Sequence, residues 1–111
     1  SDQQNKVITQ KQEIFAMTDS FEEVYDIVTG RCSMCHAREP VYEGIHSAPK
    51  HVFLETQADV TAQAKAIFIQ SGVTHAMPPA NITLMEETER AKIRGWFRAA
   101  SQKMPMTLRL N

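Results

Sequence analysis

The 111-residue sequence has little of several features that would point to a particular class of function. It has only two cysteines, and its formal net charge is −1, from 12 basic and 13 acidic residues. This balance argues against a nucleic-acid-binding surface and against a polybasic patch for membrane lipids. No apolar run approaches the roughly 20 residues of a membrane-spanning helix, so we expect no membrane segment in this chain. The hydrophobic fraction of 42% still indicates a globular protein.

Three stretches have the apolar periodicity of amphipathic helices, and no stretch alternates convincingly enough for a sheet. The patterns Ser20-x-x-Glu23 and Thr83-x-x-Glu86 fit capping boxes, which predicts where two of these helices begin. The expected helices cover roughly residues 20–29, 59–71 and 84–102.

The regions outside these helices suggest one domain with an N-terminal extension. Residues 1–17 mix polar and apolar types and predict a lead-in arm or linker, followed by a single domain over residues 18–111. The polar opening SDQQNKVITQKQE is typical of a cut fragment or a processed protein. The segments between the helices are rich in turn residues. We therefore predict an all-α fold whose long loops enclose a bound group.

The stretch RCSMCHA holds both cysteines, Cys32 and Cys35, with His36 directly after the second. A disulfide between them would close a very small loop and would stabilise little. A thioredoxin-like redox pair needs a βαβ context, which no pattern here supplies. A structural zinc site normally needs four ligands, and the other histidines lack finger-like spacing.

The pattern C-x-x-C-H is typical of c-type haem attachment. In that chemistry the two thiols add across the haem vinyl groups as thioethers, and the next histidine ligates the iron. The spacing lets both cysteines reach a vinyl group while a helical turn brings the imidazole to the metal. We predict one covalent haem c held by Cys32 and Cys35, with His36 as an iron ligand. The zinc and redox-pair interpretations remain as alternatives.

Met77, in HAMPPAN, is the strongest candidate for the second axial ligand of the iron. Two prolines follow it directly and stiffen the loop, so little chain entropy is lost when the sulfur binds. His75 is the main rival, and an open sixth site is the other alternative. Methionine more often fills protein cores, and that interpretation suits Met85 better.

Taken together, these motifs resemble the class I (monohaem, His/Met) cytochrome c family, over about residues 18–103. The resemblance implies that the first and last helices cross and pack tightly against each other. The residues that would meet are Val24, Tyr25 and Val28 on one side and Ile93, Trp96 and Phe97 on the other.

The same resemblance implies two further haem-binding residues. A proline carbonyl of this family accepts the Nδ1–H of the axial histidine, and Pro49 matches it, with Pro40 as the alternative. Asn81 resembles a polar residue that forms hydrogen bonds near the methionine sulfur in related small bacterial cytochromes.

The combined pattern RCSMCHAREPVYEGIHSAPKHVFLET, HAMPPANITLMEETER and IRGWF resembles more narrowly one bacterial family. It is similar to the C-terminal cytochrome c domain of the membrane-bound urate oxidases (urate hydroxylases). The resemblance implies an upstream membrane domain of the same polypeptide that donates electrons from urate oxidation, with residues 1–17 as the tether. A downstream respiratory cytochrome or terminal oxidase would accept them.

The resemblance also implies a role and a compartment. The domain alone would be an electron carrier rather than an enzyme, and would lie on the periplasmic side of the inner membrane, where bacteria form the thioethers. The alternatives are a free periplasmic diffusible cytochrome c, or a haem enzyme or gas-binding domain with an open sixth site.

Overall fold

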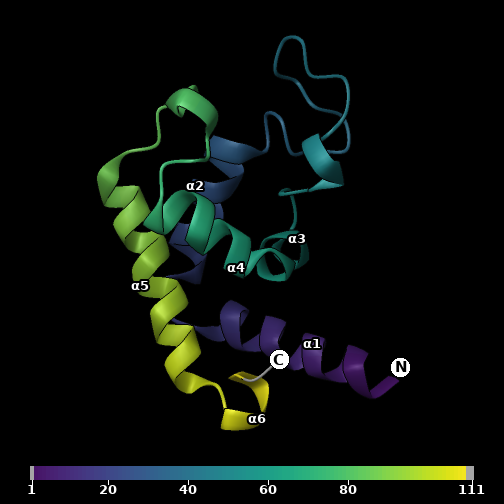
Figure 1. Ribbon diagram of the computed structural model, residues 1–111, viewed down its shortest axis with the longest axis vertical. Coiled ribbons are helices and arrows are strands. Elements are labelled where there is room, and N and C mark those ends of the chain that lie inside the picture. The colour runs from purple at the N-terminus through teal and green to yellow at the C-terminus, as the bar shows by residue number, and fades with distance from the viewer. Residues whose placement is uncertain (1, 110–111) are drawn as a thin grey trace.

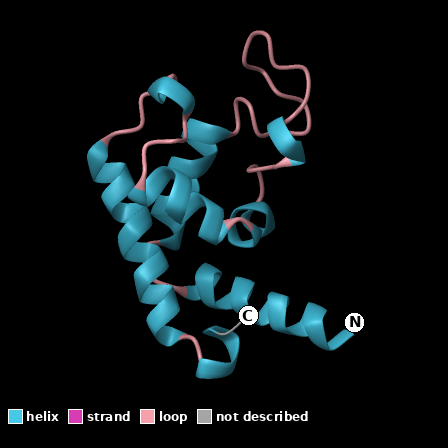
Figure 2. Cartoon of the chain, in the orientation of Figure 1, coloured by secondary structure: helices cyan, strands magenta, loops and turns pink. Residues whose placement is uncertain are grey.

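Helices joined by loops make up this computed structural model, which describes the backbone of residues 2–109 and the side chains of residues 10–109 (Figures 1 and 2). No strand occurs in that range, which confirms the predicted all-α class. The α-helices are α1 (Asp2–Met17), α2 (Phe21–Cys32), α3 (Gln57–Ala62), α4 (Ala64–Ile67), α5 (Glu87–Lys103) and α6 (Met106–Arg109). Shorter segments are the 3₁₀ turns η1 (Pro49–His51) and η3 (Pro79–Asn81) and the π-helical η2 (Phe68–Val73).

The centre of the core lies where α2 packs against α5, a contact that was expected from the family resemblance. Val24 and Val28 from α2 are fully buried, and so are Ile93 and Trp96 from α5. The ring of Phe21 lies 5.8 Å from that of Trp96. Burial of each such side chain stabilises the fold by about 1.5–3 kcal/mol, so this helix pair supplies much of the stability of the core.

Residues 1–17 were expected to form an arm or linker, and their described part forms α1, whose last turn packs into the core. Phe15 is buried, and its ring lies 5.2 Å from that of Trp96. The Phe15 carbonyl accepts the indole Nε1–H of Trp96 at 2.9 Å, which satisfies the one polar group of that buried side chain. The end of α1 is therefore part of the folded unit, while its beginning extends away from the other helices (Figure 1).

The start of α2 differs from the predicted capping box at Ser20. The backbone of Ser20 has a φ of 78° and its side chain makes no capping hydrogen bond. An N-cap residue normally has extended φ and ψ angles, which direct its hydroxyl toward the free N–H groups. The left-handed backbone at Ser20 does not place the hydroxyl there, so the prediction of a Ser20–Glu23 box is wrong.

The start of α5 also differs from the prediction. The helix begins at Glu87, and its capping box pairs Glu86 with Glu89. Thr83, which was expected to cap this helix, instead donates its hydroxyl to the Arg31 carbonyl at 2.6 Å. The predicted box lay one helical turn too early because Thr83 is engaged by α2.

The helix predicted over residues 59–71 begins two residues earlier and is divided into α3, α4 and η2. The Asp59 N–H donates to the Thr56 hydroxyl and the Thr56 N–H donates to the Asp59 carboxylate, each at 3.0 Å. This capping box fixes the start of α3. At Gln63 the backbone leaves the helical region, with φ −104° and ψ 17°, and this separates α3 from α4.

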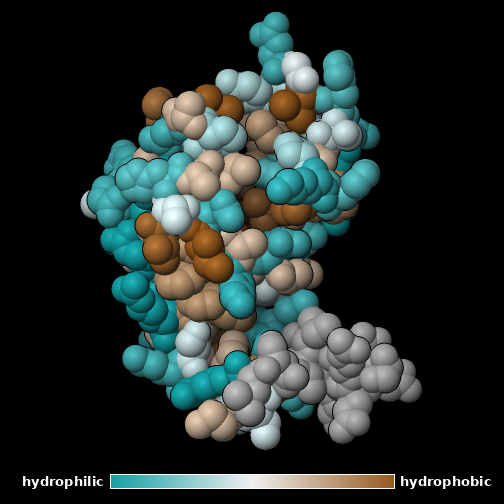
Figure 3. All heavy atoms as spheres, viewed as in Figure 1, coloured by the Kyte–Doolittle hydropathy of each residue, from teal (hydrophilic) through white to brown (hydrophobic). Residues whose placement is uncertain are grey.

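The η2 segment packs closely against α5. A Cβ atom on Gly72 would lie only 3.1 Å from Cγ2 of Ile93, so a glycine here permits the close approach. The ring of Phe68 stacks on that of Phe97 with a centroid distance of 4.2 Å. Apolar side chains reach the surface in this region, over η2 and α5 (Figure 3), where Ile69 and Val73 are exposed.

Candidate functional site

Both cysteines and the histidine that follows them lie on one turn at the end of α2. The His36 N–H donates to the Cys32 carbonyl at 2.9 Å, and the Cys35 N–H donates to the same carbonyl at 3.2 Å. Residues spaced i, i+3 and i+4 on such a turn share one face. Both thiols are free and half-buried. The turn therefore brings the backbones of Cys32, Cys35 and His36 together at the end of α2.

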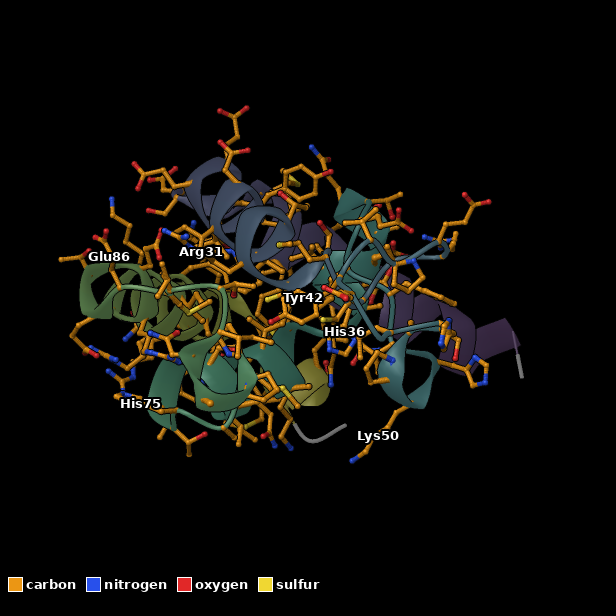
Figure 4. The ribbon with its side chains drawn as sticks, turned by 90° about the horizontal axis from the view of Figure 1, so that it is seen from above. Arg31, His36, Tyr42, Lys50, His75 and Glu86 are labelled. Carbon is orange, nitrogen blue, oxygen red and sulfur yellow. The ribbon has the colours of Figure 1, made fainter. Side chains whose placement is uncertain are left out.

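The His36 ring is oriented by a backbone carbonyl. Its Nδ1 lies 2.9 Å from the Val52 carbonyl oxygen, so Nδ1–H donates in the neutral tautomer and Nε2 keeps a lone pair for a metal. The prediction that Pro49 supplies this carbonyl is wrong. The Pro49 carbonyl already accepts the Val52 N–H at 3.1 Å, within the η1 turn. Figure 4 shows His36 near the middle of the view.

The ionisation of Cys32 argues against the redox-pair interpretation. Burial raises the pKa of the Cys32 thiol to about 12, with a smaller increase from Cys35 and a decrease from the charge of Arg90. Redox-active C-x-x-C pairs work because a thiol pKa is lowered. The described residues contain no group of three or more His, Cys, Asp or Glu that could hold a metal ion.

Met77 lies half-buried in the loop between η2 and η3, and its backbone is held on both sides. Its N–H donates to the Gln70 carbonyl at 2.8 Å, and its carbonyl accepts from the Arg90 guanidinium at 3.0 Å. The loop is therefore fixed by hydrogen bonds as well as stiffened by its prolines.

His75, the rival axial ligand, lies at the surface. Its side chain is 72% exposed, and its Nε2 is 3.7 Å from the Glu87 carboxylate. Figure 4 shows it at an edge of the molecule, away from His36. Met85 is buried in the apolar core, which confirms its interpretation as a core residue. His75 is thus more exposed than Met77, whose side chain is half-buried.

Asn81 joins η3 to the segment before α5. Its Oδ1 accepts the Met85 N–H at 2.9 Å, and its Nδ2 donates to the Met85 carbonyl at 3.0 Å. Its expected hydrogen bond near the Met77 sulfur stays a prediction.

A charged cluster ties the cysteine turn to the segment after the Met77 loop. Arg31, directly before Cys32, makes two hydrogen bonds to the carboxylate of Glu89, at 3.1 and 3.2 Å. It also donates to the Thr83 carbonyl at 2.9 Å, while the Thr83 hydroxyl returns a bond to the Arg31 carbonyl. Bidentate arginine–carboxylate pairs have a fixed geometry, so this cluster sets the spacing between the two segments.

A second charged cluster fixes the loop after His36. Arg38 binds both carboxylate oxygens of Asp59, at 3.0 and 3.2 Å, and binds Glu55 at 2.9 Å. Hydrogen bonds from the Arg38 side chain hold the pKa of Asp59 well below its usual range. Hydrogen bonds from the Arg38 backbone and side chain likewise lower the pKa of Glu55.

We expect Asp59→Asn to destabilise the protein near neutral pH and to matter less as the pH falls into the acid range. Because the pKa of Asp59 is lower in the folded than in the unfolded state, its contribution is fully present above the unfolded value of about 3.9 and is lost progressively as the pH falls from there toward the lower folded value. Urea unfolding at about pH 7 and about pH 3 measures the difference in unfolding free energy from the unsubstituted protein. An equal difference at both pH values would contradict this account. Glu39→Gln, at an exposed loop position, is the control and should have little effect at either pH.

Three residues of this site were missed in the sequence. Val52 acts through its carbonyl, which leaves no side-chain pattern to detect. Arg31 donates to the Thr83 carbonyl, which is far away in the sequence, and Arg90 donates to the Met77 carbonyl in a loop. Neither contact leaves a pattern in the sequence. The only available signal for Arg90 was its place on the same helix face as the apolar Ile93 and Trp96.

Known proteins give no further guide to this site. No protein-family model, curated protein or solved structure matches the chain. None of the described helices has the length and apolar character needed to cross a membrane.

Proposed function

We propose that this chain is a class I cytochrome c domain that transfers electrons through one covalent haem c. Cys32 and Cys35 hold the haem, and His36 and Met77 ligate its iron. The observation that carries the proposal is the single turn that holds Cys32, Cys35 and His36, together with the short contact between Nδ1 of His36 and the Val52 carbonyl. The haem, when bound, supplies reversible one-electron exchange.

The residues of the chain serve this function by ligation and orientation. The Val52 carbonyl fixes the tautomer and the direction of the His36 ring, which leaves Nε2 for the iron. Met77 supplies a thioether from a loop held on both sides. Ligation of the iron by both His36 and Met77 would leave no open site for oxygen or substrate and would raise the reduction potential. These properties suit an electron carrier.

Asn81 remains in the proposed haem-binding set, and Pro49 leaves it, because the carbonyl that His36 contacts is that of Val52. Pro49 opens η1, the turn that positions Val52. Asn81 fixes η3 against the residues before α5, directly after the Met77 loop.

We propose the physiological partners from the resemblance to the urate oxidase family. The electron donor is a membrane domain of the same polypeptide that oxidises urate, and the acceptor is a respiratory cytochrome or terminal oxidase. The domain works on the periplasmic side of the bacterial inner membrane. Docking to the acceptor is weak and transient, as in other redox encounters.

Covalent attachment tests the proposal directly. We expect the protein, made in a bacterium that assembles c-type cytochromes, to keep its haem after denaturation and extraction with acidic acetone. Cys32→Ala and Cys35→Ala together should remove all covalent haem, because no thiol remains to form a thioether. Met34→Ala, between the cysteines, is the matched control and should keep it. Extraction of all haem from the unsubstituted protein would contradict the proposal.

A further inference from the structure

Arg90 on α5 is a buried cation that holds the Met77 loop. Its side chain is only 3% exposed. Its guanidinium donates to the carbonyls of Ser71 at 2.8 Å and Met77 at 3.0 Å, with longer contacts of 3.4 Å to the Thr74 carbonyl and the Asn81 side chain. All four acceptors belong to the single stretch 71–81. The Arg90 side chain therefore contacts several points of the loop that carries the proposed sulfur ligand.

The surroundings of Arg90 are unusual for a buried charge. Burying a charge is strongly unfavourable unless it is paired or fully hydrogen-bonded. None of the ion pairs within the described residues includes Arg90, whose bonds go to neutral oxygens. An apolar side chain would avoid this desolvation penalty, but it would leave the Ser71 and Met77 carbonyls without their donor.

We propose that Arg90 is a positioning residue for the Met77 ligand, acting through the Met77 carbonyl and not on the iron itself. This inference rests on the proposed function, in which the Met77 sulfur ligates the haem iron. A thioether is a weak ligand, and a competing ligand enters only when the methionine moves away. Bonds from Arg90 to the loop oppose that movement, because opening the loop leaves a buried guanidinium without acceptors.

The shape of the guanidinium matters in this role. Its Nη1 reaches the carbonyls of Ser71 and Met77, while Nη2 points toward Asn81. A lysine ammonium is a single point of charge and does not reproduce this planar fork. Arg90→Lys therefore keeps the charge and loses most of the geometry, while Arg90→Gln loses both.

Imidazole competition with the oxidised, haem-loaded protein tests the proposal. Imidazole must displace Met77 to bind the iron, so its apparent affinity reports how firmly the loop holds the sulfur. We expect Arg90→Gln to bind imidazole at least about tenfold more tightly than the unsubstituted protein, since bonds from a charged group are lost. Arg90→Lys should show an increase of about threefold or more. Arg98→Gln, at an exposed site on the same helix, is the control and should show no change.

The outcomes separate this inference from the proposed function. Affinities of both Arg90 variants equal to that of the unsubstituted protein would overturn the positioning role. If Arg90→Gln does not fold, Arg90→Lys alone decides, and an increase below about threefold overturns the proposal. Circular dichroism identifies a variant that is merely unfolded. If the unsubstituted protein lacks the thioether–iron absorption band before imidazole is added, the proposed Met77 ligation itself fails.

Discussion

Met77→Ala should abolish the weak red-end absorption band that a thioether–iron bond gives to the oxidised protein. Alanine has no sulfur, so the loop would no longer supply the proposed thioether ligand. The reduced variant should also bind carbon monoxide rapidly, whereas the unsubstituted protein should not, because in the proposed function Met77 ligates the iron. Visible absorption and rapid mixing with carbon monoxide measure the two effects.

Two controls distinguish Met77 from its rivals. Met85→Leu conserves volume at a buried methionine and should keep the band. His75→Ala should also keep it, since the His75 side chain faces solvent and Glu87. Persistence of the band in Met77→Ala, or its loss in His75→Ala, would contradict the ligand assignment.

Trp96→Ala should reduce the free energy of unfolding by about 3–5 kcal/mol, as large aromatic truncations in cores do. Trp96 is 1% exposed and its ring contacts those of Phe15 and Phe21. The substitution would leave a cavity where α1, α2 and α5 meet, and would leave the Phe15 carbonyl without its donor. Urea unfolding monitored by circular dichroism measures the loss.

Trp96→Phe separates the two contributions. It keeps most of the aromatic contact and removes the indole N–H. We expect the free energy of unfolding to fall by about 1–3 kcal/mol, because the Phe15 carbonyl is left buried without its hydrogen-bond donor. A loss below about 1 kcal/mol in Trp96→Ala would show that this residue is not at the centre of the helix contact.

The sequence was a good guide where local pattern and burial agree. The apolar faces of α2 and α5 were correctly identified, because Val24, Val28, Ile93 and Trp96 follow helical periodicity and are all buried. The capping boxes at Ser20 and Thr83 failed. The capping-box pattern of Ser or Thr followed three residues later by Glu is short and occurs at many positions. Tertiary contacts set the backbone at Ser20 and the hydrogen bond from Thr83 to α2.

The site was predictable only as far as its side chains carry a motif. Cys32, Cys35 and His36 are adjacent in sequence, so one turn brings them together. Val52 and Arg90 contribute a carbonyl contact and a buried charge, and neither follows from residue type or spacing. The resemblance suggested the Pro49 carbonyl as the acceptor for the His36 ring. In the structure that carbonyl accepts the Val52 N–H within η1, and the Val52 carbonyl contacts His36.

The most direct test of the central claim is the intact mass of the fully denatured protein. We expect the mass of the chain plus one haem, because the two proposed thioethers would survive unfolding. Cys32→Ala with Cys35→Ala should give the mass of the chain alone. The mass of the chain alone, measured for unsubstituted protein made in cells that assemble c-type cytochromes, would contradict the prediction that Cys32 and Cys35 attach a haem.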